Sequence, residues 1–337
     1  PLLMILIIKD RYLDEWVMSM LRAIGSLQDL VLFKGWITAG SRRRVMQPTH
    51  SPVVISPKFS VCAALVAVTL WSIAPLLVEL ARDTAPLQLT ALTLLAGALA
   101  TLPLSRRAAT QTCSLGWRLS VWLGIPLLIV GAVSSYFIGM RLAPAAEAAL
   151  ITYTWPVLFV LLSQWSRWGR LQWASVAGAL IAFSGAAILL LPQALSGGVG
   201  GSASGYGLAL LAACCWALYS WLGQAAPISL TPLLPRLLLI ACALTCIASV
   251  WLEGDVALPR GEALVAGIAL GLGPYGIAMV AWDKALRFGH ASLVGSLAYG
   301  VPILAALLLV LAGMSVFDWR LPTAALLVVV GCLKAGR

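Results

Sequence analysis

Long apolar stretches, separated by short polar connections, run along the chain from about residue 60 to its C-terminal end. A helix needs roughly 20 apolar residues to cross the hydrocarbon core of a bilayer, and stretches near that length occur ten times. We therefore predict an all-α membrane protein with ten transmembrane helices. The predicted spans are residues 60–81, 87–104, 119–140, 145–163, 171–191, 205–224, 230–252, 262–285, 291–313 and 319–334.

The second half of the chain repeats the first at a shift of 146 residues. Segment 139–185 aligns with 285–331 without a gap and superposes Arg141 on Arg287, Tyr153 on Tyr299, Pro156 on Pro302, Trp173 on Trp319 and Gly185 on Gly331. A shift of 145 residues superposes Trp71 on Trp216. Each half holds five spans, an odd number, so the second half enters the membrane from the opposite side. The sequence thus predicts two inverted five-helix repeats, and such proteins bind substrate near the midplane between the repeats.

The same pattern divides the chain into four segments. We expect a cytoplasmic, amphipathic extension over residues 1–57, a first repeat over 58–195, a Gly/Ser-rich linker over 196–204 and a second repeat over 205–337. The chain opens at Pro1 rather than Met, which we interpret as truncation or processing. The sequence leaves open whether residues 1–57 are native.

Composition agrees with a membrane protein, because 61% of residues are hydrophobic and only 10% are charged, whereas soluble domains carry about 25% charged residues. The net charge of +10 comes from Lys and Arg residues that lie mostly in short loops. With the N-terminus in the cytoplasm, thirteen of these residues fall inside and four outside, which is the typical bias of cytoplasmic loops. We therefore predict a multi-pass protein of a bacterial inner membrane with both termini cytoplasmic, and no nucleic-acid partner.

Catalytic and metal-binding patterns are absent from the sequence. The seven cysteines form no Cys-x-x-Cys pair, and only two histidines could join them as ligands. Neither Gly-x-Ser-x-Gly nor His-Glu-x-x-His occurs. We predict no enzyme activity, no cofactor and no metal site. The predicted partners are the lipid bilayer and a small-molecule substrate, and a monomer would suffice to carry it.

Aromatic residues occupy matched and central positions in the two halves. Tyr153 and Tyr299 each lie eight residues into their spans, about 12 Å deep, and Trp71 and Trp216 are also central. These rings predict a cavity for a neutral or zwitterionic molecule with an apolar body; packing against neighbouring helices is the alternative. The residues expected to bind substrate are Tyr136, Tyr153, Trp155, Trp216, Tyr219 and Tyr299, and those expected to form gates are Trp71, Pro156, Trp282 and Pro302.

Prolines follow the two central tyrosines and remove a helical hydrogen bond. Pro156 frees the carbonyl of Thr152, and Pro302 frees that of Ala298. Tyr153 and Trp155 are separated by about 200° around a regular helix. Both can face one cavity only if the cavity wraps around the helix or the helix unwinds there.

These residues resemble the EamA-type members of the drug/metabolite transporter superfamily over residues 58–334. The resemblance rests on the tryptophan in the first span of each half, on the two Tyr-to-Pro helices and on the stretch from Arg170 to Gly185. Many members carry a Glu just before that stretch, where this chain has Trp168-Gly169-Arg170. The tetrapeptide Tyr153-Thr154-Trp155-Pro156 is similar to the Tyr-x-Trp-Pro of aromatic amino acid exporters in this superfamily.

The resemblance implies export of phenylalanine, tyrosine and tryptophan, with aromatic cations as a further class. It also implies a central cavity lined by the first, third, fourth, sixth, eighth and ninth spans. We therefore expect an exporter that works by alternating access, with Trp282 closing its inner side. No carboxylate lies at central depth, which favours facilitated movement over proton antiport. The same fold with other amino acids, metabolites or drugs as cargo, a lipid-acting membrane enzyme and a passive channel are the alternatives.

Overall fold

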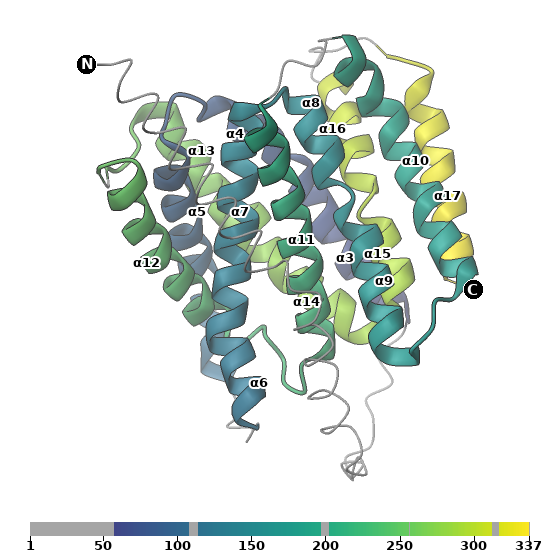
Figure 1. The fold of residues 1–337 in the computed structure, drawn as a ribbon, viewed down its shortest axis with the longest axis horizontal. Helices are drawn as coiled ribbons and strands as arrows, with labels where there is room; N and C mark the ends of the chain where they lie inside the picture. Colours follow the sequence, from purple (N-terminus) through teal and green to yellow (C-terminus); the bar gives the residue numbers. More distant parts are fainter. Residues whose placement is uncertain (1–56, 108–113, 197–201, 256, 312–316, 337) are drawn as a thin grey trace. The chain divides into compact units, whose positions relative to one another are not determined.

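The apolar stretches form helices throughout the computed structural model, which describes residues 57–107, 114–196, 202–255, 257–311 and 317–336. Within these ranges the chain is helical and contains no strand (Figure 1). The predicted extension, apart from residue 57, and the centre of the predicted linker, residues 197–201, lie outside the described residues.

Five spans make up the first half, and three of them are interrupted. The elements are α3 (Pro57–Ser72) with α4 (Ala74–Leu80), α5 (Pro86–Thr101) with a 3₁₀ turn (Leu102–Arg107), α6 (Leu115–Leu119) joined by a π turn (Ser120–Gly124) to α7 (Ile125–Leu142), α8 (Ala145–Thr152) with α9 (Trp155–Trp168), and α10 (Trp173–Ser196).

The second half has the same order of spans, but its first span is a single unbroken helix. They are α11 (Ala203–Ala225), α12 (Leu234–Leu252), α13 (Gly261–Leu272) joined by a π turn (Gly273–Ile277) to α14 (Ala278–Phe288), α15 (Ala291–Leu297) with α16 (Gly300–Leu311), and α17 (Arg320–Ala335). Among the described residues, nine helical stretches are long and apolar enough to cross a membrane. The tenth predicted span is α17, which has 16 residues.

Helices α10 and α17 pack against each other at backbone contact, side by side at one edge of the bundle (Figure 1). A Cβ atom on Gly178 would lie 2.7 Å from the carbonyl oxygen of Gly331, and one on Gly185 would lie 2.7 Å from that of Ala324. Residue numbers rise along one helix as they fall along the other, so the pair is antiparallel. The repeat shift of 146 converts Gly178 to Ala324 and Gly185 to Gly331, so each contact is the rotated copy of the other.

A second pair of contacts between the halves follows the same two-fold relation. Gly139 in α7 lies against Gly205 in α11, where an added Cβ would be 3.3 Å from the Gly205 carbonyl oxygen. The equivalent pair is Ser60 in α3 and Ala285 in α14, in which the Ser60 hydroxyl donates to the Ala285 carbonyl at 3.0 Å. Small residues at both crossings allow the helices to approach closely. The two inverted five-helix repeats predicted from the sequence are therefore present.

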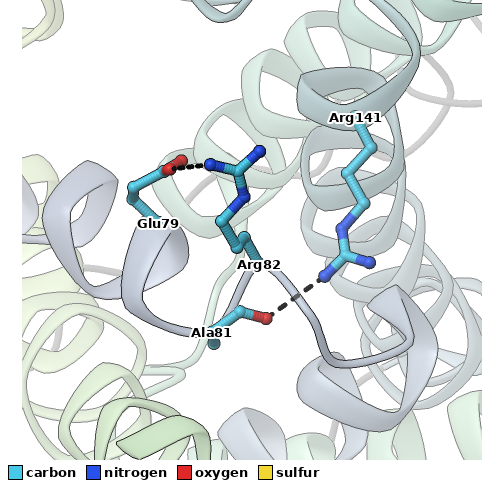
Figure 2. A network of polar contacts seen from close by, with 4 residues as sticks. All are labelled: Glu79, Ala81, Arg82 and Arg141. Atoms are coloured by element: carbon cyan, nitrogen blue, oxygen red, sulfur yellow. Dashed lines mark hydrogen bonds and ion pairs between the residues drawn. The ribbon is translucent and has the colours of Figure 1, made fainter.

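Arg141, at the end of α7, ties down the loop between the first two spans. Its guanidinium donates to the carbonyl of Ala81 at 3.2 Å and to that of Thr84. Figure 2 shows this arginine reaching the loop from its own helix, while Arg82 of the loop pairs with Glu79 at 3.0 Å.

Arg287 holds the equivalent loop of the second half. It lies at the end of α14 and donates to the carbonyl of Ile228 at 2.9 Å, between α11 and α12. The matched pair Arg141 and Arg287 thus has matched structural roles at opposite ends of the bundle. We refer below to these as the Arg141 end and the Arg287 end.

We expect the α10–α17 crossing to be sensitive to added bulk. The substitution Gly178→Leu would place a side chain where a Cβ already lies 2.5 Å from the backbone nitrogen of Ala335. Overpacking of this kind costs about 1–3 kcal/mol, so the thermal unfolding midpoint in detergent should fall by several degrees. Ala174→Leu adds the same bulk to an exposed position of α10 and should leave the midpoint unchanged. Equal midpoints for the two variants would contradict this packing.

Candidate functional site

A cavity lined mainly by aromatic side chains lies between the two halves. It comprises about 590 Å³ of empty space, part of which is open to solvent. Its lining residues are Trp71, Ala74, Pro75, Tyr136, Thr152, Tyr153, Trp155, Trp216, Tyr275 and Val301. They come from the first, third, fourth, sixth, eighth and ninth spans, as the family resemblance implied.

The fourth span is interrupted by a turn where it meets this cavity. Helix α8 ends at Thr152 and α9 begins at Trp155, so Tyr153 and Thr154 lie between two helical segments. The break is what Pro156 produces, because the proline nitrogen cannot donate to the carbonyl four residues earlier. Tyr153, within the turn, and Trp155, directly after it, both line the cavity.

The ninth span breaks in the same way before Pro302. Helix α15 ends at Leu297 and α16 begins at Gly300. The carbonyl of Ala298, expected to lose its partner, instead accepts a hydrogen bond from the amide of Val301 at 3.1 Å. Val301 then lines the cavity.

Three tryptophan rings, Trp71, Trp155 and Trp282, contact one another at one end of the cavity, and we call them the tryptophan plug. The ring of Trp282 lies 5.1 Å from that of Trp71 and 5.5 Å from that of Trp155, centre to centre. Ring pairs at such distances contribute about 0.5–1.5 kcal/mol beyond their buried area. Trp282 is fully buried, and its indole nitrogen donates to the hydroxyl of Ser220 at 3.1 Å.

The plug closes the cavity toward the Arg287 end. Trp282 follows Tyr275 by seven residues along the eighth span, about 10 Å along a helix, and lies on the Arg287 side of it. Trp282 is not among the residues that line the cavity, whereas Tyr275 is. Trp282 therefore lies behind the cavity wall on the Arg287 side.

Tyr275 is the main lining residue that was missing from the predicted site. Its ring stacks on Trp216 at 6.1 Å with an interplanar angle of 23°. It lies in the π turn that contains Pro274, whose carbonyl accepts a hydrogen bond from the indole nitrogen of Trp71 at 2.9 Å. The sequence signal was the stripe that Tyr275 forms with Met279 and Trp282 at helical spacing.

Two residues predicted to bind substrate lie outside the cavity lining. Tyr219 is buried behind Trp216, with ring centres 5.6 Å apart. Tyr299 is fully buried in an apolar cluster that includes Ala182 and Val328, and its ring contacts Phe183 at 5.8 Å. Tyr136, Tyr153, Trp155 and Trp216 do line the cavity, and so does Trp71, which was predicted as a gate.

The cavity wall contains no charged side chain among the described residues. Its polar groups are tyrosine and threonine hydroxyls and indole nitrogens, and the Thr152 hydroxyl already donates to the carbonyl of Ala209 at 3.3 Å. In the described part of the chain, no group of three or more His, Cys, Asp or Glu residues could hold a metal ion. The site is therefore suited to binding a molecule through aromatic surface and hydroxyl contacts.

Comparison with known proteins assigns this architecture. Two segments of the chain, residues 58–191 and 203–335, each match the EamA-like transporter family. This chain belongs to that family. It is a multi-pass membrane protein whose family transports small molecules.

Individual relatives agree with the family assignment. The chain is 35% identical over 275 residues to a protein of Ancylobacter novellus named aromatic amino acid exporter YddG. These residues make up 80% of this chain and 94% of the relative. The chain is 31% identical over 257 residues to an uncharacterised protein of Pseudomonas aeruginosa, covering 74% and 84% of the two chains. A solved crystal structure superposes on this EamA-family chain with a TM-score of 0.69 and 30% identity, covering 83% of this chain and 98% of the other.

We expect water to reach the aromatic cavity. A cysteine introduced by Ala74→Cys lines the cavity and should react with a small water-soluble thiol reagent in detergent solution. Ala64→Cys lies in the same span but is fully buried and outside the lining, so it should not react. Both variants need a background without the native cysteines, and the reaction can be followed by mass spectrometry. Equal labelling of the two sites would contradict the cavity as described.

Proposed function

We propose that this transporter exports aromatic amino acids across a bacterial inner membrane by alternating access. The observation that carries the proposal is the cavity between the inverted repeats, whose walls are aromatic on several sides. Phenylalanine, tyrosine and tryptophan present a flat apolar ring that can pack on Trp216, Tyr275 and Trp155. The similarity to an aromatic amino acid exporter supports the same substrate class.

The state of the two ends supports alternating access. The repeat shift of 146 relates Tyr136 to Trp282, which lie toward opposite ends of the bundle. Tyr136 lines the open cavity, while Trp282 is fully buried in the plug and bonded to Ser220. The cavity thus extends toward one end as far as Tyr136, while the equivalent residue at the other end is packed in the plug. Exchange of the two conformations between the halves would open the Arg287 end and close the Arg141 end.

The distribution of charged residues bears on the orientation of the protein in the membrane and on the charge of its substrate. The excess of Lys and Arg in loops at the Arg287 end favours a cytoplasmic location for that end, and the plugged side of the cavity would then face the cytoplasm. A wall without charged residues suits a zwitterion, whose own charges balance, better than an aromatic cation. A substrate with a net charge would be buried in this cavity without an oppositely charged partner, which is costly.

Transport into proteoliposomes tests the proposal. We expect Tyr153→Ala and Trp216→Ala each to lower the initial rate of radiolabelled phenylalanine counterflow about tenfold, because each removes a ring from the cavity wall. Trp251→Ala removes a ring that is 84% exposed and far from the cavity lining, and its rate should match that of the wild type.

Competition with unlabelled amino acids identifies the cargo. Tryptophan and tyrosine should suppress phenylalanine counterflow, whereas threonine and leucine at the same concentration should not. Strong suppression by threonine or leucine would favour a different cargo on the same fold. Unchanged flux in both cavity variants would refute the site.

A further inference from the structure

A second chamber lies at the Arg287 end of the bundle, between the ends of α9, α11 and α17 and the starts of α10 and α15. It comprises about 1220 Å³ of empty space, part of which is open to solvent. In Figure 1 it corresponds to the lower ends of α9, α10 and α17. Nine of its fifteen lining residues are polar, unlike those of the aromatic cavity, and the wall includes Ser163, Gln164, Arg167, Trp221, Gln224 and His290.

The two chambers share helices but lie on opposite sides of the plug. On α9, Trp155 lines the aromatic cavity and Ser163 lines the polar chamber, about 12 Å apart along the helix. Between them, Phe159 is fully buried and faces Gly295, where an added Cβ would lie 3.1 Å from the ring. On α11, Trp216 lines the aromatic cavity and Trp221 lines the polar chamber.

Two adjacent polar side chains at the chamber wall are almost fully buried. Gln164 is 5% exposed; its amide nitrogen donates to the hydroxyl of Ser292 at 3.3 Å, and its oxygen accepts from the backbone nitrogen of Gln172 at 2.7 Å. Ser163 is also 5% exposed, and its hydroxyl has no hydrogen-bond partner among the described residues. A buried hydroxyl left unpaired is costly, and this one belongs to a residue of the chamber wall.

The charge of the wall selects an anionic group. The ionisable side chains that line it are Arg167 and His290, and no Asp or Glu is among the lining residues. The guanidinium of Arg167 lies 5.2 Å from the ring centre of Trp168, and its planar fork matches a carboxylate. Trp221 adds an aromatic face held in place by its indole nitrogen, which donates to the hydroxyl of Ser166 at 2.9 Å.

We propose that this polar chamber is a loading site that binds an aromatic amino acid before it passes the plug. Arg167 binds the α-carboxylate, and Trp168 and Trp221 contact the aromatic side chain. The inference rests on the proposed function, because it takes the same substrate and places its first contact at the cytoplasmic end. It differs in its residues, since none of them lines the aromatic cavity.

Sided transport kinetics test the loading site. Radiolabelled tryptophan uptake is measured in inside-out membrane vesicles, which present the cytoplasmic face, and in right-side-out vesicles. Arg167→Gln should raise the KM about tenfold in inside-out vesicles, the loss expected for one charge-assisted bond, and leave it unchanged in right-side-out vesicles. Arg118→Gln, at an exposed arginine outside the chamber lining, should behave as the wild type on both faces.

Analogues identify the recognised group. Indole-3-propionate keeps the carboxylate and lacks the amine, and tryptamine does the reverse. In inside-out vesicles of the wild type, indole-3-propionate should inhibit tryptophan uptake more strongly than tryptamine. This preference should disappear in Arg167→Gln and return in part in Arg167→Lys.

The outcomes separate this inference from the proposed function. If Arg167→Gln matches the wild type on both faces while Tyr153→Ala still loses flux, the loading site is refuted and aromatic export stands. An equal rise in KM on both faces would also refute it, because a general structural effect explains that result. If the wild-type protein moves no aromatic amino acid, both proposals fail.

Discussion

Inside a bilayer a helix must satisfy its own backbone hydrogen bonds, and irregular backbone is tolerated only where protein or a water-filled cavity surrounds it. Four of the helix interruptions in this chain supply cavity-lining residues: Ala74 after the α3–α4 break, Tyr153 between α8 and α9, Tyr275 in the second π turn and Val301 after the α15–α16 break. The π turn before α7 is the exception. The interrupted segments must be shielded from lipid. The cavity that they line therefore lies between the two halves.

The symmetry of the repeats and the asymmetry of the structure have different physical origins. Glycine contacts such as Gly178 with Gly331 constrain backbone against backbone, and they are rotated copies because the two halves share a pattern of small residues. The plug has no copy at the other end. Ser220, which holds Trp282, corresponds to Pro75 under the shift of 145, and proline offers no hydroxyl and breaks the first span. One state of an alternating-access cycle requires this combination: a symmetric arrangement of helices and a plug at one end alone.

The sequence predicted the scaffold better than the site, for reasons that individual residues make clear. Span positions and the inverted repeat follow from apolar length and from rare matches such as Tyr153 with Tyr299, which do not depend on side-chain orientation. Orientation decides the site. Tyr219 and Tyr299 occupy the right depth but face the packed interior, while Tyr275 enters the cavity because a π turn around Pro274 changes the local register. Periodicity counted on a regular helix cannot reveal that change.

Helix α11 contributes to the walls of both chambers. It runs unbroken from Ala203 to Ala225, in contrast to its repeat partner, and carries Trp216 in the aromatic cavity and Trp221 in the polar chamber. Ser220, between them, is bonded to the plug through Trp282. An unbroken helix tilts as a unit, so a tilt about the level of Ser220 displaces its two ends in opposite directions. Such a tilt would narrow one chamber while it widens the other.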